Sequence, residues 1–189
     1  ICRVPRPWVR DPGFTIVESA RAEAAGYSFP SGHTQTAVGF FGGVARFTGR
    51  LWLRIACIVI LLLVSVSRMY LGVHTPADVG VSFVTAAVLV LVMYPLMEST
   101  LWFPNRIYVI LGVLLGCSLA FVGFMEFFPF PADIDAGNLA EAVKNAYSMT
   151  GAVGGMLVVS VFDDRLLQFP TRAPWWGQAV KLLGGLVLV

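Results

Sequence analysis

Long apolar blocks set the strongest limit on what this chain can fold into. Crossing the hydrocarbon core of a bilayer as a helix takes about 20 apolar residues. Hydrophobic residues make up 57% of the 189 residues and charged residues only 13%, more apolar surface than a water-soluble domain of this size could bury. The sequence therefore predicts an all-α fold, a polytopic transmembrane bundle of about six membrane helices. The six blocks span residues 33–47, 51–67, 76–97, 106–125, 146–161 and 174–189.

The composition also indicates which partners and cofactors the protein does not use. The net charge is +2 and no run of basic residues is present, so we expect no nucleic-acid partner. The three cysteines form no metal-binding motif with the two histidines, and no cofactor is expected. We expect one domain over residues 1–189, surrounded by membrane lipids. We also expect it to be truncated at both ends, because Ile1 is not a methionine and the final LLGGLVLV lies inside an apolar run.

The charges between the blocks predict how the chain sits in its membrane. The link between the first two blocks carries Arg46, Arg50 and Arg54 and no acidic residue, which is typical of a cytoplasmic loop. The loop 126–144 carries four acidic residues against one lysine and is predicted to be external. An odd–even count of the blocks agrees with both assignments. We therefore expect a multi-pass protein of the cell (plasma) membrane with both histidines on its extracytoplasmic side.

The stretch YSFPSGHTQT, residues 27–36, places the first histidine where an apolar block begins. Ser31 and Gly32 directly precede this predicted helix, so their backbone N–H groups should be free to bind an anion. The Ser31 hydroxyl can add one more donor. Two simpler interpretations remain: Ser31 caps the helix, and His33 is an interfacial histidine bonded to a loop.

A second polar cluster lies between the second and third blocks. Thr75 is a good N-cap and Pro76 a good first helical residue, so His74 and Asp78 should lie about one turn apart. The carboxylate would then hold one imidazole nitrogen and leave the other exposed as a nucleophile or base. The simpler interpretation is a capping box beside an unrelated histidine, with Arg68 reaching toward the headgroups.

The two clusters together favour a site for a tetrahedral dianion. Arg6, which precedes Pro7, adds a second guanidinium to that of Arg68. One guanidinium group can donate two parallel hydrogen bonds to two phosphate oxygens. Its positive charge also offsets the negative charge that develops during phosphoryl transfer.

These residues resemble the motifs of the type 2 phosphatidic acid phosphatase (PAP2) superfamily, which also includes vanadium haloperoxidases. Pro30-Ser31-Gly32-His33 matches the second motif, and Ser67-Arg68, five residues, His74, three residues and Asp78 match the third. The first motif matches only at Arg6-Pro7, since its lysine would fall two residues before Ile1. The motifs cover residues 6–78, and the resemblance is to the bacterial integral-membrane lipid phosphatase branch of the family. The remaining blocks fit the family only in being membrane helices.

The resemblance implies a role for each motif residue. His74 would attack phosphorus and form a phosphohistidine, and Asp78 would orient His74. His33 would protonate the leaving oxygen and then activate water. The phosphoryl oxygens would be held by Arg6, Arg68, Ser31 and the Gly32 amide. Pro30 and Ser67 would support the site, and no metal would be needed.

The resemblance and the outward-facing site together predict a membrane phosphatase acting on a lipid phosphate. Undecaprenyl diphosphate, phosphatidic acid and phosphatidylglycerol phosphate are the candidate substrates. One alternative is a phosphotransferase that passes the phosphoryl group to another acceptor. A non-catalytic membrane protein is a second alternative. An intramembrane serine protease built on Ser31 would leave Arg68 and Asp78 without a role, and a haloperoxidase does not fit a chain of membrane helices. The sequence sets no oligomeric state.

Overall fold

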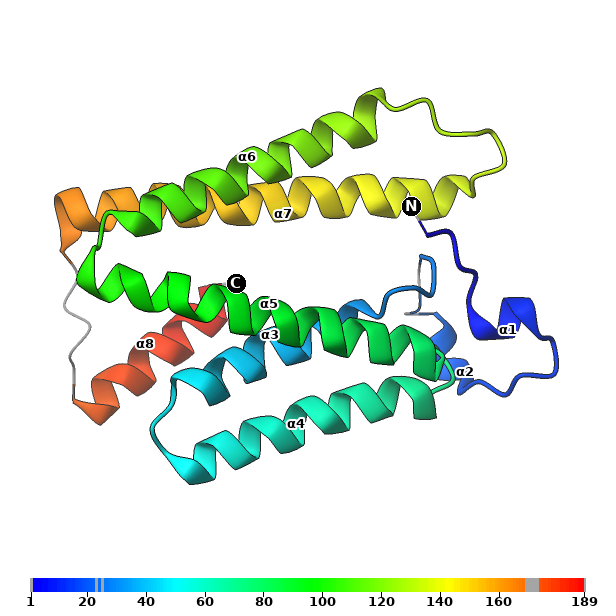
Figure 1. Ribbon diagram of the computed structural model, residues 1–189, viewed down its shortest axis with the longest axis horizontal. Helices are drawn as coiled ribbons and strands as arrows, with labels where there is room; N and C mark the ends of the chain where they lie inside the picture. Colours follow the sequence, from blue (N-terminus) through cyan, green and yellow to red (C-terminus); the bar gives the residue numbers. More distant parts are fainter. Residues whose placement is uncertain (1, 23, 25, 169–173, 189) are drawn as a thin grey trace.

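The computed structural model describes residues 2–22, 24, 26–168 and 174–188, and within these ranges every regular element is a helix (Figure 1). The predicted all-α class is confirmed. The elements are α1 (Pro7–Arg10), α2 (Glu18–Arg21), α3 (Gly32–Phe47), α4 (Leu51–Tyr70), α5 (Pro76–Trp102), α6 (Arg106–Phe127), α7 (Ala136–Phe162), the π-helical η1 (Asp163–Leu167) and α8 (Trp175–Leu188).

Four stretches of the described chain are long and apolar enough to cross a membrane: α4, α5, α6, and α7 continued by η1. Helices α3 and α8 have 16 and 14 residues. At 1.5 Å per residue they are about 24 Å and 21 Å long, less than the hydrocarbon core of about 30 Å. The structure is thus the predicted helical membrane bundle, with four rather than about six helices of full spanning length.

Helices α5 and α7 extend furthest beyond their predicted apolar blocks. Helix α7 begins at Ala136 rather than residue 146, because the Asp135 side chain caps it by accepting a 2.7 Å hydrogen bond from the Asn138 N–H. Its first turns are polar and carry no apolar signal. Helix α5 continues to Trp102 with Pro95 inside it. The predicted external loop 126–144 therefore shortens to residues 128–135.

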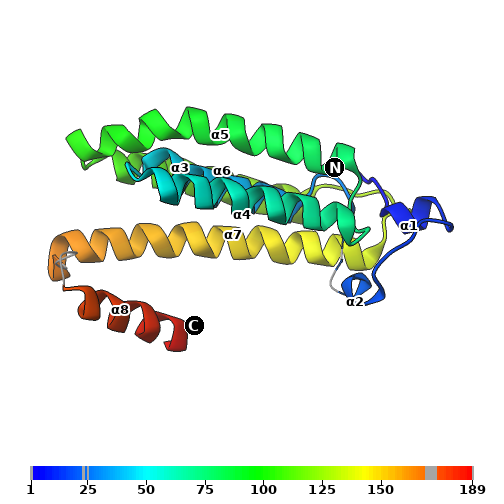
Figure 2. The same ribbon diagram turned by 90° about the horizontal axis from the view of Figure 1, so that it is seen from below.

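The helices form two packed groups (Figures 1 and 2). Helix α3 packs against α4 and α5 around four buried residues, Ala37, Val38, Leu61 and Ala86. Helices α6 and α7 form a hairpin that has few contacts with α5. Most other large apolar side chains on these helices are exposed, as expected for surfaces that face lipid.

One end of the bundle gathers the polar segments. Figure 1 shows the starts of α3 and α5 and the end of α4 at this end, beside α1 and α2. The connection between α6 and α7 lies there too, whereas the link between α3 and α4 lies at the opposite end. Both histidines thus share an end with the acidic connection, and the arginine-rich link is at the other. This is the arrangement that the odd–even count requires.

A close backbone contact fixes the N-terminal segment against the turn between α4 and α5. The Val17 N–H donates to the Leu71 carbonyl at 3.2 Å. Gly72 has a φ of +74°, and a Cβ atom there would lie 2.5 Å from the Thr15 carbonyl oxygen. Both the left-handed backbone and the lack of space require glycine at this position.

We expect Gly72→Ala to lower the melting temperature and the activity, with Gly26→Ala as the matched control. Gly26 also has a positive φ, +78°, but a Cβ atom there would meet nothing within 4 Å. Both variants lose about 1–2 kcal/mol from the left-handed conformation, and Gly72→Ala adds a backbone clash. Thermal unfolding in detergent measures the difference. Equal melting temperatures would show that the Thr15 contact is not constraining.

Candidate active site

A pocket of about 250 Å³ lies at the polar end of the bundle. It brings together four of the predicted site residues, Arg6, His33, Arg68 and His74, from the N-terminal segment, α3, α4 and the turn before α5. Among the described residues that line it are two arginines and no carboxylate, so this lining favours an anion. The other lining residues are Ser19, Ala20, Ala24, Leu71 and Val73.

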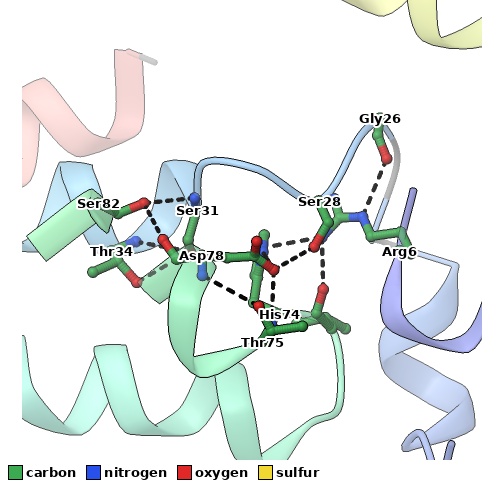
Figure 3. Close-up of polar contacts among 10 residues, drawn as sticks. Arg6, Gly26, Ser28, Ser31, Thr34, His74, Thr75, Asp78 and Ser82 are labelled. Carbon is green, nitrogen blue, oxygen red and sulfur yellow. Dashed lines mark hydrogen bonds and ion pairs between the residues drawn. The ribbon is translucent and has the colours of Figure 1, made fainter. Parts of the chain in front are cut away.

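Arg6 ties the N-terminal segment to the pocket (Figure 3). Its Nε donates to the Gly26 carbonyl at 3.1 Å, and its Nη1 donates to the Val73 carbonyl at 3.0 Å. The same Nη1 lies 3.1 Å from His74 Nε2. Burial lowers the pKa of Arg6, and the nearby Asp78 carboxylate opposes that shift. A guanidinium has no acceptor, so His74 Nε2 must present its lone pair to Arg6.

His74 is therefore assigned as a neutral imidazole with its proton on Nδ1. The side chain is 5% exposed. Burial first, and the Arg6 charge second, lower its pKa from 6.5 to about 4. At neutral pH the unprotonated Nε2 points toward Arg6 and the pocket. This is the state a nucleophilic imidazole needs.

Asp78 lies behind His74, but the predicted hydrogen bond between them is not formed. Asp78 Oδ2 is 3.8 Å from His74 Nδ1, which is longer than a hydrogen bond. The oxygen instead accepts from the Ser28 hydroxyl at 2.6 Å and the Thr75 N–H at 2.8 Å. Thr75 and Asp78 form a capping box at the start of α5. The simpler interpretation of this cluster is thus correct in its capping box, and His74 stands one turn before the carboxylate as predicted.

Ser31 is the N-cap of α3, and the expectation that its N–H is free was wrong. That N–H donates to the Ser82 hydroxyl at 2.6 Å, and Ser82 donates to the Asp78 carbonyl at 2.7 Å. Ser31 Oγ accepts from the Thr34 N–H at 3.4 Å and from the Thr34 hydroxyl at 3.0 Å. The side chain is fully buried and does not line the pocket. Ser31 therefore joins α3 to α5 in this structure.

The remaining motif residues occupy different places around the pocket. Arg68 lies in the last turn of α4, and its Nε is buried without a hydrogen-bond partner among the described residues. Gly32 opens α3 and does not line the pocket. Ser67 is half-buried on α4, and its hydroxyl donates to the Val64 carbonyl of the same helix at 2.7 Å. Pro30 follows a cis peptide bond and is exposed.

Sequence reasoning missed three parts of this site. Helix α2 forms one wall of the pocket. Ser28 and Ser82 are 1% and 0% exposed and bond to the side chain and backbone of Asp78. A signal was present for Ser82, since a serine four residues after Asp78 shares its helix face inside an otherwise apolar run. The role of Ser28 depends on a contact 50 residues away, which spacing does not reveal.

Among the residues that the structure describes, no three His, Cys, Asp or Glu side chains gather where they could hold a metal ion. Among the described residues that line the pocket, Arg6 and Arg68 offer charge to a ligand, and the two histidines add imidazole nitrogens.

The pKa of His74 provides a direct test of this geometry. The chain has two histidines, so histidine-selective NMR should give two ring signals, and His74→Ala identifies one of them. We expect His74 to stay neutral as the pH falls through 6.5 and to titrate at about 4. Arg6→Gln should raise this pKa but leave it below 6.5, because burial remains. Arg3→Gln is the control, since Arg3 pairs with Asp133 instead. Titration of His74 near 6.5 in the unsubstituted protein would contradict the buried, arginine-facing imidazole.

A family model for the PAP2 superfamily matches residues 1–102, more than half of the chain. The match ends where α5 ends and covers every residue of the pocket. Comparison with curated proteins found no match to this chain, and comparison with solved structures found none either. The match over the segment that builds the pocket leads to one conclusion: the chain belongs to the PAP2 superfamily, whose general chemistry is the cleavage of phosphoesters.

Proposed function

We propose that this protein hydrolyses a lipid phosphate or diphosphate through a phosphohistidine on His74, without a metal ion. The observation that carries the proposal is the pocket in which two arginines, His33 and His74 meet. Arg68 Nε is a buried donor of a charged group without a partner among the described residues. Leaving such a donor unpaired is costly, and a phosphoryl oxygen is a suitable acceptor.

The first step is attack by His74 Nε2 on phosphorus. The lone pair of this nitrogen faces Arg6, so a bound phosphoryl group would take over the Arg6 Nη1 donor and lie next to the nucleophile. The N–P bond forms as the bond from phosphorus to the ester oxygen breaks. Arg6 and Arg68 stabilise the charge on the transferred oxygens. The proton on Nδ1 stays on the ring and faces Asp78, which offsets the positive charge of the phosphohistidine.

The second residue of the mechanism is His33, which lines the same pocket. It gives its proton to the leaving oxygen, so that a phosphate ester releases a lipid alcohol and a diphosphate releases a lipid monophosphate, and His33 becomes a base. It then takes a proton from water as that water attacks phosphorus. The N–P bond breaks, inorganic phosphate leaves, and both histidines return to their starting states.

A lipid substrate is supported by the surface beside the pocket. His33 also lines an apolar groove that continues along α3 and α4, so one residue borders both spaces. A phosphate in the pocket would place its ester group near His33, and a hydrocarbon chain attached to it could follow the groove. The groove is lined by Gly32, His33, Thr36, Ala37, Phe40, Phe41 and Val64.

A phosphotransferase and a serine protease are the two alternative functions. A phosphotransferase would use the same phosphohistidine and replace water with an alcohol, and only product analysis separates it from a phosphatase. A serine protease built on Ser31 is disfavoured. The Ser31 side chain is fully buried and bonded to Thr34, outside the lining of the pocket.

Trapping the intermediate tests the proposed roles. Rapid acid-free quenching with ³²P-labelled phosphatidic acid should yield an acid-labile, base-stable phosphoprotein, as expected for an N–P bond. His74→Ala should remove this label and lower turnover at least about 1000-fold, as for other essential nucleophiles. His33→Ala should label slowly with the lipid. An aryl phosphate, whose leaving group needs no proton, should label it fast and let phosphoenzyme accumulate.

Label that persists in His74→Ala, or that maps to Ser31, would contradict the proposal. Chelation by EDTA provides an independent check. Full loss of activity with EDTA, reversed by magnesium, would replace the arginine-based mechanism with a metal-assisted one.

The proposed orientation, with the pocket on the extracytoplasmic side of the cell membrane, has its own test. We expect Ala132→Cys, in the α6–α7 connection, to react with an impermeant thiol reagent on intact cells. Gly49→Cys, in the link between α3 and α4, should react only after permeabilisation. Both positions are exposed. The background must lack the native Cys2, Cys57 and Cys117. The reverse labelling pattern would place the pocket in the cytoplasm.

A further inference from the structure

Ser28 lies outside the motif residues, yet it makes one of the shortest contacts in the site. Its hydroxyl donates to Asp78 Oδ2 at 2.6 Å, and the residue is 1% exposed (Figure 3). We infer that Ser28 is a positioning residue for phosphoryl transfer, holding the Asp78 carboxylate where it can stabilise positive charge on His74. This inference rests on the proposed role of His74 as the nucleophile.

The contacts of Asp78 show why a second donor is needed. Oδ2 accepts from both Ser28 Oγ and the Thr75 N–H, and this same oxygen is the one 3.8 Å from His74 Nδ1. Thr75 belongs to the same helix end as Asp78 and fixes the carboxylate only relative to α5. Ser28 comes from a different segment. With both donors present, the oxygen closest to the imidazole is fixed from two directions.

Ser28 is itself anchored to the segment that carries the phosphate-binding arginine. Its N–H donates to the Val4 carbonyl at 2.7 Å, two residues before Arg6. Arg6 in turn bonds to Gly26, two residues before Ser28. These reciprocal contacts fix the short segments around Arg6 and Ser28 to each other. The same unit therefore sets the guanidinium on one side of the His74 ring and the carboxylate on the other.

The chemistry gives this placement a consequence for rate. As Nε2 bonds to phosphorus, the ring gains a positive charge that it lacks in the free protein, with its proton on Nδ1. A carboxylate held close to Nδ1 stabilises this charged state more than the neutral one, which accelerates the reaction. Without the Ser28 hydroxyl, Oδ2 loses one of its two restraints. The step that makes phosphohistidine should slow, whereas binding of the phosphate by the arginines should not change.

A double-mutant cycle tests whether Ser28 acts through Asp78. Ser28→Ala, Asp78→Asn and the double variant are compared in detergent with dioctanoyl phosphatidic acid. We expect Ser28→Ala to lower kcat about 10- to 100-fold, as for other residues that orient a ligand or a catalytic group, and to leave KM within about threefold. In the Asp78→Asn background it should cost no further activity, because the negative charge it positions is already gone.

Two further variants separate positioning from simple packing. Ser65→Ala is the matched control. Ser65 is also buried, 4% exposed, and in the described part of the chain its hydroxyl bonds only to the Leu61 carbonyl of its own helix. It should keep the unsubstituted kcat. Ser28→Cys keeps a weak donor of similar size and should recover part of the activity that Ser28→Ala loses.

The outcomes are distinct. If Ser28→Ala lowers kcat by the same factor with and without Asp78→Asn, the inference is overturned. It is also overturned if both Ser28→Ala and Ser28→Cys unfold, because the residue would then be purely structural. An unchanged kcat in folded Ser28→Ala would also overturn it. In that case the proposed function still stands if the trapped phosphoprotein label is lost in His74→Ala. Loss of that dependence on His74 would instead reject the proposed function itself.

Discussion

The carboxylate of Asp78 is a charge that the fold must stabilise away from water, and much of the site's geometry follows from that requirement. The residue is 3% exposed. A buried charge needs hydrogen bonds or a paired charge to offset its desolvation. Ser28 and Thr75 supply donors from two segments, and Ser82 binds the backbone carbonyl of Asp78 while it accepts the N–H of Ser31. The carboxylate and the backbone carbonyl of Asp78 together therefore link the start of α3, the start of α5 and the N-terminal segment.

The motif spacings predicted which residues belong to the site better than they predicted what each of those residues contacts. His74 and Asp78 share a turn because Thr75 and Pro76 start a helix, and local capping rules predict that reliably. The partners of Asp78 could not be predicted, because Ser28 reaches it only through the tertiary fold. For the same reason Ser31, which looked like a phosphate ligand from its place before a helix, proved to be bonded to Ser82 and Thr34.

The fold was predicted well where hydrophobicity decides it and less well at polar helix ends. Apolar runs located α4, α5 and α6, whose lengths match a bilayer. The start of α7 depends on Asp135, a capping residue followed by polar turns, so an apolar block marks only its later part. The PAP2 match ends at residue 102, and the hairpin beyond it has few contacts with α5. Arg3 and Asp133 form an exposed ion pair between the two parts, 3.2 Å long, which contributes little in water. All of the described residues that line the pocket lie within the matched residues 1–102.

The contact of Arg6 with His74 has a consequence for turnover. Arg6 Nη1 donates to the imidazole nitrogen that would attack, and the same guanidinium would hold the phosphoryl group. An incoming substrate must exchange with an internal partner, which costs some affinity at the start of each cycle. The same exchange runs in reverse when free phosphate leaves, because the imidazole regains its lone pair and competes for the guanidinium. His74 thus competes with the product phosphate for Arg6. This competition weakens substrate binding, and it also speeds the release of phosphate.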